Sequence, residues 1–251
     1  MKISSEKYGE KSIRNKKAVL FDLGGTLVQY YEKKEFPGIL RQAVNETKNC
    51  LRQKNLFKIS TEALWQRVKE EDYEARDFQV RPLEERLQRI FQLNDSVVSE
   101  SLIMELCRCF MKPIFTLGQC YEDTYLILQK LKARNFKVAI VSNTPWGSPA
   151  NLWREEIDRL NLNKYVNTVV FCRDVGWRKP AKQIFTHTLN KLQINPEDCI
   201  FVGDNAQWDL IGPRKLGIKS ILINRRNNNQ INEENSIKNL HELIDRINWN
   251  Q

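Results

Sequence analysis

The sequence predicts an α/β protein with a Rossmann-like core, a parallel sheet and an inserted all-helical segment. Three observations support this prediction. Short apolar runs alternate with segments of helical periodicity, which is typical of parallel strands buried on both faces. Residues 30–115 interrupt the alternation and contain no convincing strand. The chain has 251 residues, more than one ordinary domain of about 150 residues, so it has room for an insertion.

The core elements follow in order along the chain. The first strand, residues 18–21, is Ala-Val-Leu-Phe and ends in the glycine-rich turn Asp22-Leu23-Gly24-Gly25-Thr26. Further strands are predicted at residues 137–142, 166–171, 199–203 and 219–223. Helices are predicted near residues 121–134, 149–160, 181–193, 207–216 and 236–248. The run from Arg225 to Gln230 is polar and is predicted to be a solvated loop.

Within residues 30–115, apolar side chains recur at helical spacing, which predicts four or five helices. One such face is Leu83, Leu87, Ile90 and Phe91. The predicted organisation is therefore a mobile basic leader over residues 1–17, a core of residues 18–29 and 116–251, and a helical insert over residues 30–115.

Composition excludes several classes of protein. With 41% hydrophobic and 28% charged residues, the chain is ordinarily globular. No window of about 18 residues is predominantly apolar, so we expect no membrane span and no signal peptide. The six cysteines form no CxxC pair and the chain has only two histidines, which predicts free thiols in a reducing cytoplasm.

The net charge of +9 is unevenly distributed. Residues 1–17 carry +4, the helical insert is nearly neutral, and residues 116–223 carry +5. No nucleic-acid-binding motif accompanies this charge, so we expect a small anionic ligand and no nucleic-acid partner. Nothing in the pattern indicates an oligomeric state.

Reactive side chains follow the predicted strands. Asp22 follows the first strand, Ser142 and Asn143 end the second, and Lys179 lies after the third. Asp204 and Asp209 follow the fourth. Because the carboxyl ends of parallel strands gather at one edge, we expect these groups to converge. Carboxylates, a hydroxyl and a lysine suit phosphoryl transfer with a divalent cation.

These four motifs, in this order over residues 18–223, resemble the haloacid dehalogenase-like hydrolase superfamily, most of whose members are magnesium-dependent phosphatases. The resemblance implies a cap at residues 30–115 and a small phosphorylated substrate. It implies that Asp22 is the nucleophile that forms an aspartyl-phosphate, and that Ser142 and Lys179 contact the phosphoryl group. It also implies Mg²⁺ ligands, which are Asp22, the backbone carbonyl of Gly24, Asp204 and Asp209.

Other residues are candidates for substrate contact. Thr26 completes the first motif and Asn143 the second, while Trp146, Trp177 and Trp208 lie in or beside the strand-end loops. These tryptophans offer a flat apolar wall for a leaving group, or they pack against the insert or the adjacent helix. Tyr30, Tyr31 and Arg81 are candidates on the side of the insert.

One departure from the family pattern leaves alternatives open. Most phosphatases of the superfamily have a second Asp, a general acid and base, where this chain has Gly24. Positioned acid–base catalysis is worth about 10²–10⁴ in rate, so an alkyl phosphate would be a poor substrate unless another group supplies the proton. The alternatives are a 2-haloacid dehalogenase, which also lacks that Asp and needs no magnesium, and a catalytically weak binding protein that keeps the scaffold.

Overall fold

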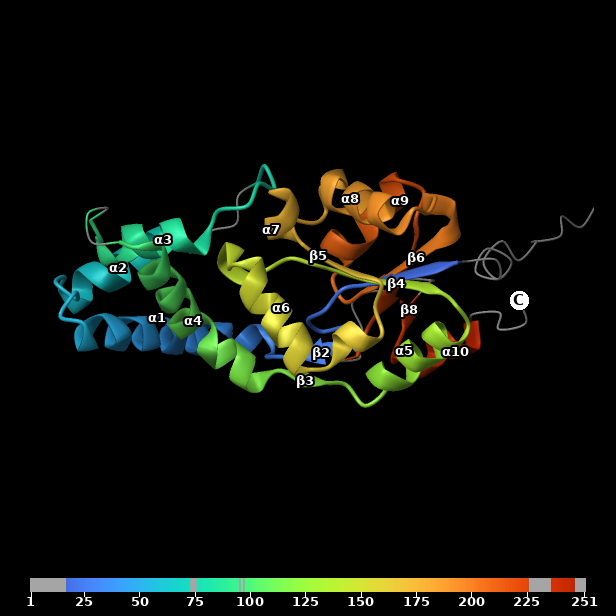
Figure 1. Ribbon diagram of the computed structural model, residues 1–251, viewed down its shortest axis with the longest axis horizontal. Coiled ribbons are helices and arrows are strands. Elements are labelled where there is room, and N and C mark those ends of the chain that lie inside the picture. The colour runs from blue at the N-terminus through green and yellow to red at the C-terminus, as the bar shows by residue number, and fades with distance from the viewer. Residues whose placement is uncertain (1–16, 73–75, 95, 97, 226–235, 247–251) are drawn as a thin grey trace, which may run out of the picture.

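A six-stranded sheet forms the centre of the core in the computed structural model, which describes residues 17–72, 76–94, 96, 98–225 and 236–246 (Figure 1). Its strand order is β5-β4-β1-β6-β7-β8, and every neighbouring pair is parallel. The strands are β1 (Ala18–Phe21), β4 (Lys137–Ser142), β5 (Thr168–Phe171), β6 (Cys199–Gly203), β7 (Lys219–Ile223) and β8 (Ser236–Ile237). The predicted α/β class with a parallel sheet is thereby confirmed.

Helices cover both faces of this sheet, which explains why its strands read as continuous apolar runs. Along β1, Val19 and Phe21 join one buried cluster and Ala18 and Leu20 join another, as the alternation of a strand requires. In Figure 1, α8 and α9 lie above the sheet, and α5 and α10 lie below it. The helices of the core are α5 (Thr124–Ala133), α6 (Ala150–Arg159), α7 (Cys172–Val175), α8 (Lys182–Leu192), α9 (Ile211–Lys215) and α10 (Leu240–Arg246).

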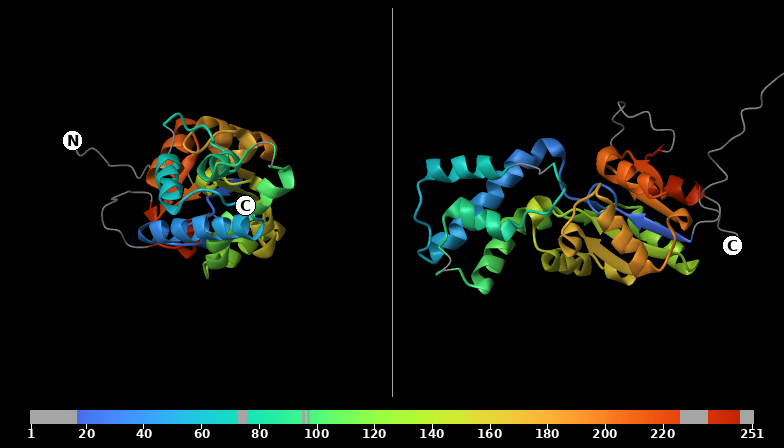
Figure 2. Two further views of the ribbon diagram at one scale, coloured as in Figure 1. Left: turned by 90° about the vertical axis from the view of Figure 1, so that its left-hand side faces the viewer. Right: turned by 90° about the horizontal axis from the view of Figure 1, so that it is seen from above.

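Four α-helices form the described part of the insert, which extends from one end of the core in Figure 1 and in the right-hand view of Figure 2. They are α1 (Phe36–Gln53), α2 (Thr61–Glu71), α3 (Leu83–Phe91) and α4 (Glu100–Leu117). Serine caps begin two of them: Ser60 Oγ accepts from Ala63 N at 3.2 Å, and Ser99 Oγ accepts from Leu102 N at 3.1 Å. At the base of the insert, β2 (Val28–Gln29) pairs antiparallel with β3 (Gln119–Cys120).

The helix predicted near residues 121–134 begins only at Thr124, and three further predicted elements also differ from the structure. The strand predicted at residues 166–171 begins only at Thr168, because the Asn167 side chain accepts a hydrogen bond from Val138 N at 2.8 Å. The helix predicted at residues 207–216 is a π-helix, Ala206–Leu210, followed by α9. Pro213 has no N–H for a bond to the preceding turn, which favours this break. The helix predicted at residues 236–248 is preceded by β8, which pairs with β7.

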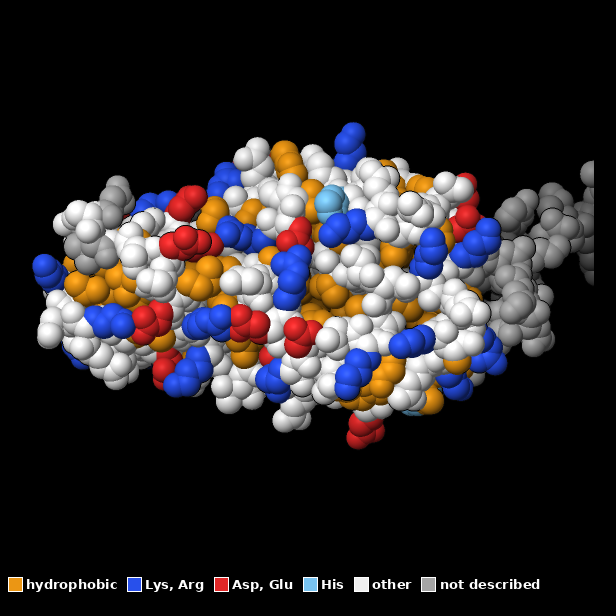
Figure 3. Space-filling view, in the orientation of Figure 1, with side chains coloured by type: hydrophobic (Ala, Val, Ile, Leu, Met, Phe, Trp, Pro, Cys, Tyr) orange, Lys and Arg blue, Asp and Glu red, His pale blue; other side chains and the backbone are white. Residues whose placement is uncertain are grey.

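The prediction of a solvated loop from Arg225 to Gln230 is wrong for Arg225, whose side chain is 11% exposed. Residues 226–230 and the predicted leader, apart from Lys17, lie outside the described residues. Among the helices that the structure describes, none is long and apolar enough to span a membrane. On the face shown in Figure 3, Lys and Arg side chains are interspersed with Asp and Glu.

Candidate active site

Asp22 and Ser142 meet at the carboxyl ends of two neighbouring strands. β1 and β4 pair in parallel, with Phe21 opposite Ile140, so the residues that follow them emerge at the same edge. Ser142 Oγ donates to Asp22 Oδ1 at 2.9 Å. Both side chains are buried, with relative exposures of 8% for Asp22 and 6% for Ser142, so this contact is shielded from water.

Lys179 lies between two carboxylates. Its ammonium donates to Asp22 Oδ1 and to Asp209 Oδ1, each at 2.7 Å, and the residue is 2% exposed. Asn143 holds the backbone of this lysine, because its Oδ1 accepts from Lys179 N at 2.8 Å and its Nδ2 donates to Lys179 O at 3.3 Å. The amide of Asn143, predicted to contact substrate, therefore binds the loop that carries Lys179.

Asp204 and Asp209 approach Asp22 from the end of β6. One carboxylate oxygen of each of the three residues lies within 4.8 Å of the others. Close backbone packing makes this approach feasible: a Cβ on Gly203 would lie 2.4 Å from Asp209 Cγ, and one on Gly25 would lie 2.2 Å from Asp204 Oδ2. Glycines at these positions let the carboxylates come close to the main chain.

The local π-helix fixes the orientation of Asp209. Asn205 Oδ1 accepts from Gln207 N at 3.0 Å and from Trp208 N at 3.1 Å, as a helix-capping side chain does. Asp209 Oδ2 in turn accepts from Asn205 N at 3.0 Å. Both oxygens of Asp209 are thus oriented by hydrogen bonds, one from Lys179 and one from the main chain.

Burial and charge act in opposite directions at this cluster. Complete burial raises the pKa of Asp209 to about 6, with repulsion from Asp22 adding to the rise and the Lys179 ammonium opposing it. Burial alone lowers the pKa of Lys179, but the charges of Asp209 and Asp22 outweigh that effect and leave the pKa raised. We therefore treat Lys179 as charged at neutral pH.

The donor set fits a hard divalent cation. Three carboxylates and one ammonium give the cluster a formal charge of −2 when all are ionised, which a divalent cation would neutralise. Carboxylate oxygens are the ligands that Mg²⁺ prefers. The three acidic residues could therefore hold such an ion.

The turn after Asp22 contains Gly24 and Thr26. A Cβ on Gly24 would meet the Tyr30 ring at 3.5 Å, which is ordinary van der Waals contact. Thr26 is fully buried, and its carbonyl oxygen accepts hydrogen bonds from Arg225 Nη2 at 2.7 Å and Nε at 3.1 Å. In this structure, the Thr26 side chain is therefore out of reach of a ligand in solvent.

The three tryptophans near the strand ends have different neighbours. The Trp146 ring contacts that of Phe110 of α4 in a tilted arrangement, with centroids 5.4 Å apart and planes at 39°, so it packs against the insert. The backbone of Trp177 forms an antiparallel bridge with Gln79 of the insert. Trp208 is half-buried, and the guanidinium of Arg178 lies 5.8 Å from its ring centre. Trp146 thus has the packing role that was one of the two predicted interpretations.

The insert also contacts the loop that carries Lys179. Val80 N donates to Gly176 O at 3.0 Å, and Arg178 N donates to Phe78 O at 2.7 Å. These two backbone hydrogen bonds flank the Gln79–Trp177 bridge, so the segment 78–80 lies beside residues 176–178 like an added strand. No helix or strand was assigned to residues 78–80 from the sequence, so this contact was not predicted.

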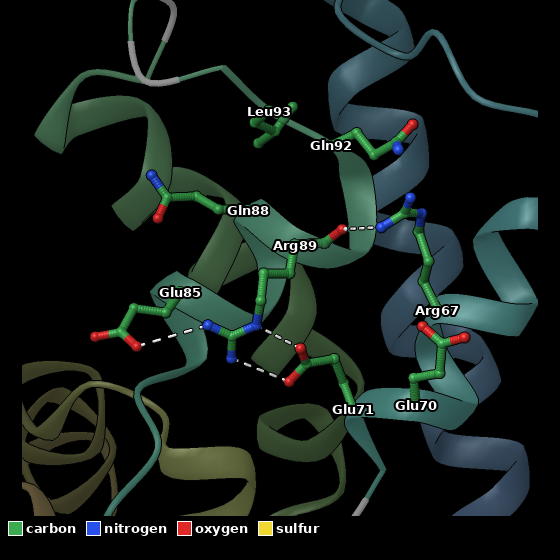
Figure 4. Close-up of a pocket in the computed structure, with 8 residues that line it drawn as sticks. All are labelled: Arg67, Glu70, Glu71, Glu85, Gln88, Arg89, Gln92 and Leu93. Atoms are coloured by element: carbon green, nitrogen blue, oxygen red, sulfur yellow. Dashed lines mark hydrogen bonds and ion pairs between the residues drawn. The ribbon is translucent and has the colours of Figure 1, made fainter.

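A separate pocket of about 470 Å³ lies within the insert and is lined by α2, α3 and the residues that follow α3 (Figure 4). Apart from Leu93 its lining is charged and polar, and Arg89 is paired there with Glu71 and Glu85. All of its lining residues fall between 67 and 93, so none of the strand-end residues takes part.

Comparisons with known proteins agree with this geometry. The model of the family "haloacid dehalogenase-like hydrolase" matches residues 16–217. A glyceraldehyde 3-phosphate phosphatase from Methanothermobacter thermautotrophicus is 29% identical over 110 residues, which are 44% of this chain and 47% of that protein. An (S)-2-haloacid dehalogenase from Burkholderia cepacia is 32% identical over 108 residues, 43% of this chain and 45% of that protein.

Among solved structures, a HAD phosphatase from Thermococcus onnurineus is 25% identical with a TM-score of 0.65, and the match covers 91% of this chain and 96% of that one. The alignments with the two curated relatives span less than half of each relative's length. The family model, in contrast, covers the first four core strands and all of the strand-end residues described above. The chain therefore belongs to the haloacid dehalogenase-like hydrolase family.

Proposed function

We propose that the protein is a phosphatase that uses a divalent cation, Mg²⁺ in particular, and acts on a small organic phosphate. The observation that carries the proposal is the position of Asp22. Its carboxylate receives two hydrogen bonds, from Ser142 and from Lys179, and lies beside two further carboxylates. A nucleophilic oxygen, positive donors and a cation site within one small volume are what phosphoryl transfer requires.

In the proposed reaction, Asp22 attacks phosphorus. Both donors bind Oδ1, so among the described residues Oδ2 has no hydrogen-bond donor. A bond forms from Oδ2 to phosphorus while the bond from phosphorus to the leaving oxygen breaks, and the alcohol departs with a proton from solvent. Water then attacks the aspartyl-phosphate, which releases inorganic phosphate and regenerates Asp22.

Without substrate, Ser142 and Lys179 orient Asp22. The third hydrogen of the Lys179 ammonium, and the Ser142 hydroxyl once it turns away from Asp22, would donate to oxygens of the phosphoryl group as negative charge builds on them. A cation held by Asp22, Asp204, Asp209 and the carbonyl of Gly24 would supply Lewis-acid neutralisation of that charge.

The leaving group receives little help from the residues around Gly24. The nearest side chain is Tyr30, which presents ring carbons to Gly24. Burial, reinforced by the negative charge of Glu156, raises the pKa of the Tyr30 hydroxyl well above its usual value, so that this group is a poor acid. We therefore propose that aryl and acyl phosphates, whose leaving groups are stable as anions, are better substrates than alkyl phosphates.

A second candidate function is dehalogenation of a 2-haloacid. The similarity to the Burkholderia dehalogenase favours it, and so does the absence of a carboxylate at Gly24. The mechanism would again begin with attack by Asp22, but on carbon. Asp204 and Asp209 would have no part in that reaction, so we place the phosphatase first.

A panel of alkyl, aryl and acyl phosphates and one chloroalkanoate tests the proposal, with Mg²⁺ or EDTA in each assay. We expect phosphate release that requires Mg²⁺ and is abolished in Asp22→Asn. Asp158→Asn is the matched control, since Asp158 is exposed on α6. Phosphate release that persists in Asp22→Asn would refute the mechanism. Halide release in EDTA would transfer the assignment to the dehalogenase.

A further inference from the structure

Arg225 makes an unusually complete set of contacts for a residue beyond the end of β7. Its Nη1 and Nη2 donate to the two oxygens of Asp123 at 3.0 and 2.9 Å. Its Nη2 and Nε also donate to the carbonyl oxygen of Thr26, at 2.7 and 3.1 Å. The guanidinium lies 3.8 Å from the centre of the Tyr121 ring. All three guanidinium nitrogens thus donate hydrogen bonds, and only the planar guanidinium of an arginine can make these contacts together.

This network is buried. The side chains of Arg225 and Asp123 are 11% and 5% exposed, and Asp123 Oδ2 also accepts from Leu240 N at 2.7 Å. The contacts therefore join three distant parts of the chain: the turn after β1, the start of α5 and the start of α10. Because a buried charge without its partner is costly, the pair holds these parts in one arrangement.

The turn that Arg225 holds is the one that follows Asp22. Leu23 O accepts from Leu27 N and Val28 N, each at 2.9 Å, which closes the turn from the inside. Arg225 adds a contact from a distant segment, because its guanidinium donates to the carbonyl oxygen of Thr26. Gly25 lies between Leu23 and Thr26, against the Asp204 carboxylate. A displacement of the turn would therefore alter the spacing between Asp22 and Asp204.

We infer that Arg225 is a positioning residue for the candidate active site: it fixes the turn 23–28 and so sets the geometry of Asp22 relative to the carboxylate of Asp204. The effect on turnover rests on the proposed function. The effect on cation binding rests only on the cluster of Asp22, Asp204 and Asp209, and the effect on the turn rests on neither. Arg225 lies outside the residues 16–217 that match the family model, so the segment after Gly217 becomes part of the machinery that supports the site.

Arg225→Lys tests the inference, because lysine keeps the charge but cannot contact Asp123, Thr26 and the Tyr121 ring together. Arg154→Lys is the matched control: Arg154 pairs with Asp174 at 2.7 Å and lies over the Phe171 ring. In Arg225→Lys we expect kcat to fall about 10- to 100-fold with little change in KM, as for a misplaced catalytic group. We expect the amides of the turn 23–28 to exchange hydrogen at least about tenfold faster. Arg154→Lys should change neither.

Three outcomes separate the inference from a purely structural role and from failure of the proposed function. Faster hydrogen exchange in the turn with an unchanged kcat would make Arg225 merely structural and would overturn the inference. Unchanged hydrogen exchange in the turn would also overturn it. If the unmodified protein releases no phosphate, the proposed function fails, and a Mn²⁺ titration followed by electron paramagnetic resonance decides instead. A weaker Mn²⁺ affinity in Arg225→Lys then supports the inference, and an equal affinity overturns it. If Arg225→Lys does not fold, Asp123→Asn takes its place, since an asparagine oxygen still accepts from Leu240 N.

Discussion

Two glycines at the contact between insert and core allow a matched test of that contact. Gly147 and Gly176 both have left-handed backbone, with φ of +67° and +78°. A Cβ on Gly176 would meet nothing within 4 Å, whereas a Cβ on Gly147 would lie 2.0 Å from the carbonyl oxygen of Arg81 in the insert. Replacing each glycine with alanine adds the same backbone strain, but only Gly147→Ala adds a collision with the insert.

The size of the difference follows from these distances. A Cβ does not approach a backbone atom closer than 3.0 Å, so Arg81 O must move by at least 1 Å in Gly147→Ala. Left-handed strain costs about 1–2 kcal/mol in either variant. If the movement also breaks the two hydrogen bonds between segment 78–80 and residues 176–178, about 0.5–1.5 kcal/mol is lost for each bond. We expect the free energy of unfolding to fall by about 1–2 kcal/mol in Gly176→Ala and by about 2–5 kcal/mol in Gly147→Ala.

Urea denaturation gives both free energies, and hydrogen exchange locates the change. The informative amides are those of Val80 and Arg178, which donate to Gly176 O and Phe78 O across the contact. Both should exchange faster in Gly147→Ala than in Gly176→Ala. Equal losses of stability with equal exchange in the two variants would show that the insert does not rest on this loop in solution, and the reasoning would be refuted.

Three further predictions concern the site and the thiols. Gly24→Asp should fold, because a Cβ at this position meets the Tyr30 ring only at the ordinary contact distance of 3.5 Å. It should raise turnover of alkyl phosphates relative to aryl phosphates, whereas Gly24→Asn, which has no acidic proton, should leave that ratio unchanged. An equal gain in the two variants would contradict a general-acid role for the new carboxyl group. Without added metal, Lys179→Met should lower the free energy of unfolding by about 3–5 kcal/mol, because it leaves two buried carboxylates without their partner. Mg²⁺ should restore part of that loss, and thermal unfolding with and without Mg²⁺ measures both effects. Burial raises the pKa of the Cys107 thiol, so iodoacetamide at neutral pH should leave Cys107 unmodified until the protein unfolds, and rapid labelling of the native protein would argue against that burial.

The strands of the core were predictable from sequence because each one is marked by its own run of apolar residues. Strands buried on both faces must be apolar throughout, so runs such as Ala18–Phe21 stand out from the amphipathic helices around them. Once the strands are placed, parallel pairing brings their carboxyl ends to one edge, and the residues that follow them come together. The meeting of Asp22, Ser142 and Lys179 needed no further information.

The rest depended on contacts between distant segments, which leave no periodic signal. Arg225 is one of two consecutive arginines in a polar stretch, and its buried partners, the carboxylate of Asp123 and the carbonyl oxygen of Thr26, lie 102 and 199 residues away. Asn143 was predicted to bind substrate, but its side chain holds the backbone of Lys179, 36 residues further along the chain. The docking of segment 78–80 is made by backbone atoms, which carry no side-chain pattern at all.

The charged residues of the site are costly to the stability of the fold. Lys179 is 2% exposed and Asp209 is fully buried, so neither ion has water to solvate it. Their mutual attraction and that of Asp22 offset the loss of hydration only while the charged groups stay in close contact, as they are here at 2.7 Å. Asn143 fixes Lys179, Asn205 fixes Asp209, and Arg225 holds the turn after Asp22, so each charged group depends on a polar residue that is not itself one of the reactive groups. These three supporting residues, rather than the reactive groups alone, determine whether the site keeps its shape.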